Sequence, residues 1–227
     1  MKLGRMLMIV GAILGVFVVG VVALFLVQNF REESRRTQSS NKLKLLSLAM
    51  HNHHDTHKTY PGQGTGANWK GKSLLSWRVH LLPFIDQQSL YERFHLDEPW
   101  DSEHNFKLID SMPSAFRSPG SLHSNKTSYL APILPGSPFA SQGAFNQASI
   151  VDLQSRTIMF VEAVDEKAVI WTKPEDLEID PENPTAGITG SSKGGFLVVM
   201  FDGSVRFIEQ SIDSKSLRAM YTSQGLD

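Results

Sequence analysis

The stretch GGFLVVMFDGSVRFI, residues 194–208, contains two runs of strand-forming residues separated by Asp202-Gly203. Residues 196–201 are apolar at every position, which is typical of a strand buried in the middle of a sheet. Residues 204–208 alternate, with Val205 and Phe207 on one face. An Asp-Gly pair between two such runs favours positive φ at both central turn positions, so we predict a type I′ β-hairpin.

The segments around this hairpin predict further strands and a last helix. Residues 157–161 (TIMFV) and 168–172 are both strand candidates because they are short runs rich in β-branched and apolar residues. Asp213 or Ser214 is placed to cap a helix that runs through Met220. We therefore expect the sheet to lie in the C-terminal part of the chain.

The N-terminal part of the chain reads as one long helix. No Gly or Pro occurs from Gln28 to Tyr60, and Leu43, Leu46 and Met50 recur at spacings of three and four. This stripe is what a helix needs to pack on a core. Shorter helical patterns follow at 73–94 and 101–110. Helices first and strands late predict an α+β fold, with the long helix packed on an antiparallel sheet that ends in the hairpin and a short helix.

Leu7–Val27 is a run of 21 residues without a charged or strongly polar side chain. A helix of this length spans about 31 Å, close to the bilayer core of about 30 Å. A signal peptide is the alternative, but its apolar region is shorter and no A-x-A cleavage site follows here. We therefore predict a single-pass anchor at residues 1–28 and a domain at 29–227. Charges on either side of the run do not decide its orientation.

Composition excludes several classes of function. The net charge of −1 gives no global field that indicates nucleic acid. The chain has no cysteine, which excludes disulfides, thiolate metal sites and a cysteine nucleophile. No phosphate-binding loop, G-x-S-x-G or H-E-x-x-H motif occurs. We predict no catalytic residue and no cofactor.

The sequence HNHHDTH, residues 51–57, is the densest cluster of chemically reactive side chains. On a helix His53 and His57 lie at i and i+4 on one face, which is the geometry of a two-histidine metal edge. Further ligands would have to come from His80, His95 or His104. The alternative is that these residues cap the carbonyl end of the helix and interact with its dipole. We predict the capping role, with His53 and His57 as weak metal candidates.

The acidic segment PEDLEIDPENP, residues 174–184, offers carboxylates of the kind that calcium prefers. The EF-hand spacing with its central glycine is missing, so we interpret it as a solvated acidic loop.

Several stretches match, in the same order, a known bacterial family of unknown function (domain of unknown function 1559). They are 31–62, 74–105, 129–136 (YLAPILPG), 168–177 (AVIWTKPEDL) and 201–208 (FDGSVRFI). The chain resembles this family, whose members are similar to type IV pilins or pseudopilins in their N-terminal part. The resemblance implies a long helix laid against an antiparallel sheet, a domain outside the cytoplasm, and no catalytic residues.

The chain departs from the family's pattern at three places. No prepilin processing site or acidic residue stands near the start of the apolar run, so the resemblance does not extend to filament assembly through that residue. Ser39-Ser40 occupies the position of a cysteine. Many members carry a histidine followed by nine residues and Asp-Gly, but counting back ten from Asp202 gives Ser192.

Three functions follow as hypotheses. The leading one is a membrane-anchored, non-enzymatic, pilin-like envelope protein of the bacterial inner membrane that acts by assembly or protein interaction. Its partners would be the bilayer along Leu7–Val27, further copies of the chain or other envelope proteins, and no nucleic acid. The second is an extracytoplasmic solute- or glycan-binding module that uses Trp69, Trp100 or Trp171. The third is a metal-dependent hydrolase built on His51–His57.

Overall fold

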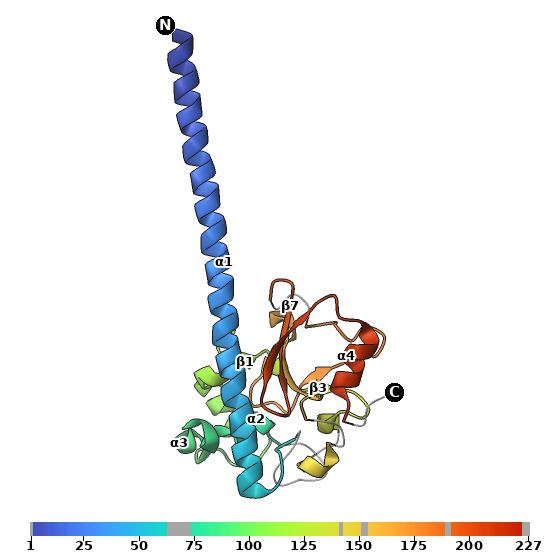
Figure 1. Cartoon of the computed structure of the whole chain (residues 1–227). Helices are drawn as coiled ribbons and strands as arrows, with labels where there is room; N and C mark the ends of the chain where they lie inside the picture. The colour runs from blue at the N-terminus through green and yellow to red at the C-terminus, as the bar shows by residue number, and fades with distance from the viewer. Residues whose placement is uncertain (1, 63–73, 141–142, 151–153, 189–191, 224–227) are drawn as a thin grey trace.

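A computed structural model describes residues 2–62, 74–140, 143–150, 154–188 and 192–223, apart from the side chains of residues 2, 3, 5–13, 16 and 149 (Figure 1). The first element, α1 (Lys2–His57), is a single helix of 56 residues. It ends because Lys58 adopts a left-handed conformation with φ 61°, just before Pro61-Gly62. The predicted long helix is confirmed.

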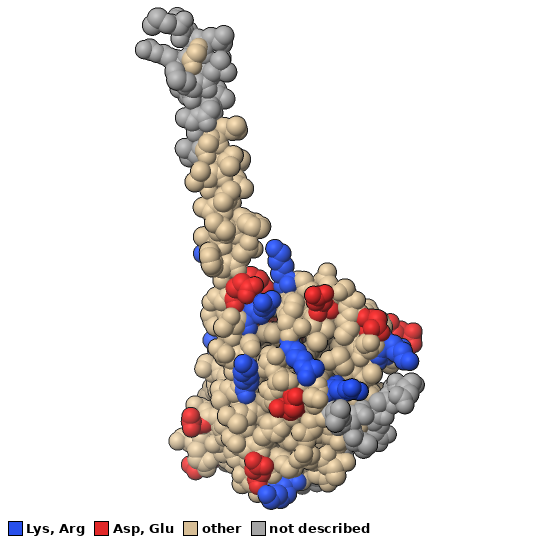
Figure 2. All heavy atoms as spheres, viewed as in Figure 1, with Lys and Arg blue, Asp and Glu red and all other residues tan. Residues whose placement is uncertain are grey.

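The two ends of α1 have different surroundings. Residues 39–57, the docked half, run along the domain, and Leu43, Leu46 and Met50 are fully buried there. Residues 14–30, the stem, project away from the domain, and those of their large apolar side chains that the structure describes are exposed. In the part of the stem that is not grey, Figure 2 shows no charged residue.

The transmembrane part of the predicted fold class is wrong. Over the residues whose side chains are described, no helix is both long enough and apolar enough to cross a membrane. A span needs about 20 consecutive apolar residues, and the described side chains of the run Leu7–Val27 are only those of residues 14, 15 and 17–27. The single-pass membrane localisation predicted with it is therefore also wrong. The boundary expected at residue 28 falls inside α1, which continues across it.

The main sheet has four antiparallel strands in the order β2-β4-β7-β8. The strands are β2 (Tyr129–Leu130), β4 (Ile158–Glu162), β7 (Gly195–Met200) and β8 (Val205–Glu209). Every residue of β7 is buried, as expected for a central strand. The α+β class and the buried central strand are confirmed.

Alternation along β7 separates two apolar cores, one on each face of the sheet. Leu197 and Val199 pack into the core that contains Leu43, Leu46 and Met50 of α1. Phe196 and Val198 belong to a second core with Leu217 and Tyr221. These last two residues lie on α4 (Ser214–Tyr221), which Asp213 caps as predicted. The sheet therefore lies between α1 and α4 (Figure 1).

The turn of the hairpin differs from the prediction. Met200 O accepts from Gly203 N at 2.9 Å, and Met200 N donates to Ser204 O at 2.9 Å, so three residues form the loop. Gly203 has φ 83°, while Asp202 is not among the described residues with positive φ. This is the three-residue hairpin with one left-handed glycine, and the type I′ prediction is wrong. The Asp202 carboxylate holds the loop by accepting from Ser204 N and Oγ, at 2.9 and 2.6 Å.

The region between α1 and the sheet consists of short elements. The predicted helix at 73–94 is divided into α2 (Trp77–His80), η1 (Leu82–Ile85) and α3 (Gln88–Tyr91). Pro83 lies in the first turn of η1, and Asp86 ends this helix with φ 59°. Short 3-10 helices also occur: η2 (Asn105–Ser111), η3 (Ser114–Phe116), η4 (Pro138–Ala140), η5 (Gln147–Ser149) and η6 (Asp165–Lys167).

Two small strand pairs complete the described elements. β1 (Lys126–Thr127) pairs with β5 (Val169–Ile170) in antiparallel orientation. β3 (Pro132–Ile133) pairs with β6 (Leu177–Glu178) in parallel orientation. The pair β3–β6 holds the acidic segment that follows residue 173 beside the main sheet.

Candidate binding site

A groove with a volume of about 570 Å³ lies between the end of α1 and the short helices that follow it. Six residues define this histidine groove: His53, His57, His80, Phe84, Gln88 and Tyr91. The first two come from α1, the third from α2, and the others from η1 and α3. The groove therefore joins two segments that residues 61–76 separate in sequence.

His53 is the most constrained residue on the α1 side. Its side chain is 6% exposed, and its Nδ1 lies 2.9 Å from Thr59 O. Because a carbonyl oxygen only accepts, Nδ1 carries the hydrogen, and Nε2 is the acceptor in the neutral ring. Burial lowers the pKa of His53 and the neighbouring His57 and His54 lower it further, against the effect of the hydrogen bond to Thr59. His53 is therefore held neutral, with one defined acceptor atom.

His53 and His57 lie together as the i, i+4 spacing predicts, with ring centroids 4.4 Å apart. Phe84 lies against both, at 5.5 Å from His53 and 6.1 Å from His57. His51 belongs elsewhere, since its Nδ1 is 3.2 Å from the hydroxyl of Tyr60. His95 and His104 stack on each other at 3.5 Å.

The described part of the chain contains no group of three or more His, Asp or Glu side chains that could hold a metal ion. The His51–His57 cluster therefore lacks, within those residues, the three converging ligands that the hydrolase hypothesis required. That His53 and His57 do not form a metal site stays a prediction.

The opposite wall of the groove is aromatic and uncharged. His80 is 7% exposed, and its ring centroid is 6.5 Å from that of Tyr91. The hydroxyl of Tyr91 is protonated at neutral pH, and burial raises its pKa further above that range. Among the described residues that line the groove there is no Lys, Arg, Asp or Glu. Such a lining is suited to binding an uncharged molecule. The described lining offers no pair of oppositely charged side chains for acid–base chemistry.

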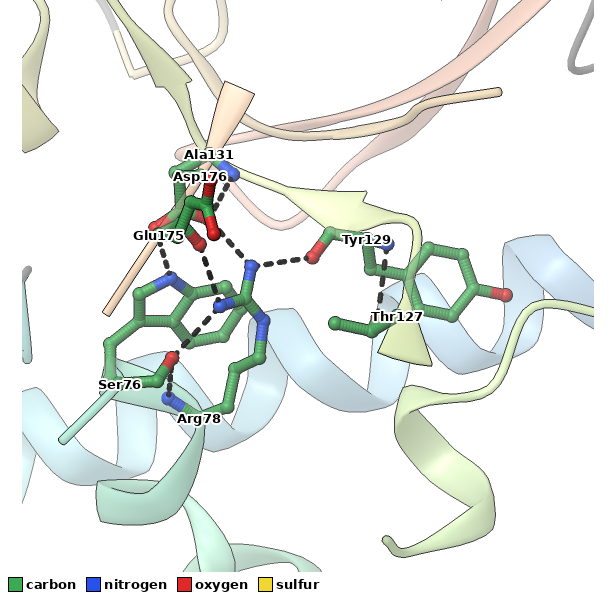
Figure 3. Close-up of polar contacts among 8 residues, drawn as sticks. Ser76, Arg78, Thr127, Tyr129, Ala131, Glu175 and Asp176 are labelled. Carbon is green, nitrogen blue, oxygen red and sulfur yellow. Dashed lines mark hydrogen bonds and ion pairs between the residues drawn. The ribbon is translucent and has the colours of Figure 1, made fainter. Parts of the chain in front are cut away.

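A buried ion pair holds this wall in place (Figure 3). Arg78 Nη2 is 2.6 Å from Asp176 Oδ1, and both side chains have no exposed surface. The carboxylate also accepts from Trp77 Nε1 at 3.0 Å and from Ala131 N at 2.9 Å. Burial raises the pKa of Asp176 and lowers that of Arg78, and the pairing opposes both shifts.

The remaining hydrogen bonds of Arg78 tie α2 to the sheet. Its guanidinium donates to Ser76 Oγ at 2.8 Å, to Tyr129 O at 3.0 Å and to Glu175 O at 3.3 Å (Figure 3). Ser76 Oγ also caps α2 by accepting from Arg78 N. His80 is two residues further along α2, so this network positions it in the groove.

Sequence reasoning missed this ion pair. Asp176 was expected to belong to a solvated loop, but it is buried, and that interpretation is wrong for this residue. The signal that could have found the pair is Arg78 itself, which stands in the mostly apolar stretch LLSWRVHLL. A charge inside such a run is buried only with a partner.

The two positions singled out by the sequence resemblance, Ser192 and Asp202-Gly203, do not form one site in this chain. Asp202-Gly203 follows β7 and lies beside α1, where a Cβ on Gly203 would be 3.5 Å from Ser47 Oγ. Ser192 precedes β7, is 8% exposed and forms an isolated bridge with Gly195. The two positions therefore lie at opposite ends of the central strand.

Neither of the two described tryptophans that were proposed for solute or glycan binding is fully exposed. Trp171 is fully buried in the core and donates from Nε1 to Ile109 O at 2.7 Å. Trp100 is half-buried, with Lys173 Nζ 5.8 Å from its ring centroid. Trp69 lies outside the described residues. The exposed role predicted for Trp171 is wrong, because the ring is needed to fill the core.

Comparison with known proteins gives one result. No curated protein and no solved structure shows significant similarity to the chain. Residues 28–141, which are 114 of the 227, match a family described as a protein of unknown function (DUF1559). The matched part includes the docked half of α1 and every residue of the histidine groove. The chain therefore belongs to the DUF1559 family of proteins of unknown function.

Proposed function

We propose that this chain is a non-enzymatic protein that acts by assembling with other copies of itself through the stem of α1. The observation that carries the proposal is a continuous exposed apolar surface on the stem. Eleven large apolar side chains there are at least 45% exposed: Leu14, Phe17, Val18, Val19, Val21, Val22, Leu24, Phe25, Leu26, Val27 and Phe30. Exposed apolar surface of this extent marks an interaction site.

The occupant we propose is the stem of further copies of the chain. Exposed apolar residues stand at consecutive positions, such as 17–19 and 24–27, so they cover every side of the helix. A partner with one groove would cover one side only. Several stems side by side would cover all sides, and each copy supplies the same apolar chemistry. The pilin-like resemblance of the long helix and its sheet supports assembly of this kind.

The test compares two double substitutions on the full-length chain. Val18→Glu with Val22→Glu places charges on the stem, and Leu45→Glu with Leu48→Glu makes the same kind of change at exposed positions of the docked half. We expect the parent and the second variant to sediment as oligomers at micromolar concentration, and the first variant as a monomer. A monomeric parent would contradict the proposal. So would a stem that inserts into lipid vesicles as a single chain.

A second candidate function is binding of a small solute, and the histidine groove is the observation that favours it. Its volume of about 570 Å³ falls within the range of natural ligand sites, roughly 300–1,000 Å³. This function is independent of assembly, because the groove and the stem lie at opposite ends of α1.

A further inference from the structure

We propose that the histidine groove binds a neutral aromatic ring that carries one O–H or N–H donor, of which phenol is the simplest example. This inference rests on the second candidate function above and names the class of its ligand. Three properties of the groove lead to it: its apolar lining, the lack of Lys, Arg, Asp and Glu in the described lining, and the position of the hydrogen on the neutral ring of His53.

The lining gives the groove its preference for a ring. Phe84, Tyr91 and Leu96 pack against the main core but are only partly buried, so part of their apolar surface faces the groove. Phe84 already lies edge-on to the imidazole of His57, with an angle of 89° between the two ring planes. Aromatic rings favour such edge contacts and offset stacking, so a bound ring would extend this packing.

The absence of Lys, Arg, Asp and Glu from the described lining selects a neutral ligand. A carboxylate or an ammonium group in the groove would lose its hydration without gaining an ion pair, which is strongly unfavourable. A sugar is a poor fit for a related reason. Its hydroxyls point outward on all sides of the ring, and those that face the apolar side chains of Pro83, Phe84 and Leu96 would lose their hydrogen bonds to water.

His53 supplies the polar contact that orients the ring. Because Nδ1 donates to Thr59 O, the acceptor Nε2 is on the other side of the imidazole. A ligand O–H or N–H that reaches this atom makes a hydrogen bond that a plain hydrocarbon cannot make. A single donor on the ring is therefore enough for recognition.

The experiment titrates the full-length chain with phenol, toluene, benzoate, benzylammonium and glucose, and follows binding by ligand-observed NMR. We expect phenol to bind saturably and about tenfold more tightly than toluene, which corresponds to one hydrogen bond of about 1.4 kcal/mol. We expect benzoate, benzylammonium and glucose not to bind.

Substitutions at two exposed positions on α1 test whether phenol binds in the groove. Thr56 lines the groove and Asp55 does not, and both side chains are exposed. Thr56→Trp should fill the groove and abolish phenol binding, whereas Asp55→Trp should leave it unchanged. His53→Phe should remove the preference for phenol over toluene, and His54→Phe, next to the groove but outside its lining, should keep it.

The outcomes separate this inference from the function on which it rests. If benzoate, benzylammonium or glucose binds as tightly as phenol and Thr56→Trp blocks it, the groove is a solute site and the ligand class is wrong. If none of the five compounds binds, or if Thr56→Trp has no effect on binding, the groove is not a site for small solutes. The solute-binding function and the ligand class inferred from it then both fail. The ligand panel on the unaltered chain and the two tryptophan variants decide this even if His53→Phe does not fold.

Discussion

The stem and the docked half of α1 are parts of one unbroken helix, yet their apolar residues have opposite surroundings. Leu43 and Leu46 of the docked half are fully buried, whereas Leu14 and Leu24 of the stem are 63% and 65% exposed. In the docked half the apolar residues form a stripe on one face, which a single sheet can cover. In the stem they occupy every face, and one domain cannot cover a helix from all sides. The distribution of apolar residues around a helix, more than their number, decides whether its own chain can bury them.

Polar contacts mark the change from one half to the other. Glu32 Oε1 accepts from Lys193 N at 3.2 Å, and Arg35 Nε donates to Pro119 O at 3.2 Å. Slightly further along, Ser39 Oγ and Tyr129 OH lie 2.8 Å apart in the buried interior. The helix therefore becomes part of the domain over about two turns, between Glu32 and Ser39.

The largest effect predicted from this comparison is on the stability of the domain. Leu46→Ala should lower the free energy of unfolding by about 2–5 kcal/mol, because it removes a fully buried side chain and leaves a cavity. Leu24→Ala, the same change on the stem, should alter it by less than about 0.5 kcal/mol. Urea unfolding of the full-length chain at one protein concentration measures both.

The same pair of variants has a second readout that sharpens the comparison. If the stem mediates assembly, Leu24→Ala should weaken association and leave the free energy of unfolding unchanged. Leu46→Ala should lower the free energy of unfolding and leave association unchanged. Equal losses of stability in the two variants would mean that the stem is buried against the domain, and the distinction between the halves would be wrong.

A smaller effect is expected at the hairpin turn that lies beside the docked half. Gly203→Val should lower the free energy of unfolding by about 1–3 kcal/mol, because a β-branched residue is strained at φ 83°. We expect no added loss of stability from steric clashes of the Cβ atom. A Cβ there would be 3.5 Å from Ser47 Oγ and 3.9 Å from His51 Nε2, which are ordinary contact distances.

The control for this variant is Ser192→His, at the other end of β7, which places a histidine where the sequence resemblance led us to expect one. We expect it to change stability by less than about 1 kcal/mol, because Ser192 forms only an isolated bridge at the start of the hairpin. Thermal or urea melts of the two variants make the comparison. A silent Gly203→Val would show that the turn does not depend on its left-handed glycine.

Local patterns predicted the parts of the fold that depend on neighbouring residues. The stripe Leu43, Leu46 and Met50 identified the buried face of α1, and the apolar run 196–201 identified the central strand, because both signals repeat with the period of the element. The turn type was missed because Asp-Gly suits more than one hairpin loop. The side chain of Asp202, which accepts from Ser204, favours the three-residue loop here.

The site could be predicted only in part, because it depends on contacts between distant segments. The i, i+4 pair His53 and His57 is local and was found. Arg78 and Asp176 are 98 residues apart, and neither residue alone indicates the other. The apolar run Leu7–Val27 was misread for a different reason. Composition alone cannot say what covers an apolar helix, and the predicted contact with lipid rested on the length of the run.

The last and smallest effect concerns Glu162, a buried carboxyl close to the junction of the two halves of α1. Its side chain is 5% exposed and accepts from Ser118 Oγ at 2.5 Å. Burial raises the pKa of Glu162, against the hydrogen bonds from Ser118 and Ser39 and the charge of Arg35; Glu32, also on α1, raises it further. The folded chain therefore binds the proton of this group more tightly than the unfolded chain, whose carboxyl has the ordinary pKa of 4.5.

The sign of the effect on stability follows from this difference. As pH rises from about 4.5 through the raised pKa of the folded state, the unfolded chain releases the proton first, and the free energy of unfolding falls. Glu162→Gln should be more stable than the parent at neutral pH, because its uncharged amide oxygen still accepts from Ser118. The advantage should disappear towards pH 4.5, where both states of the parent gain the proton. Glu166→Gln, an exposed neighbour, should follow the parent at every pH. Urea melts from pH 4.5 to 7.5 test this, and parallel curves for Glu162→Gln and the parent would mean that Glu162 is hydrated and that the helix junction is open to water.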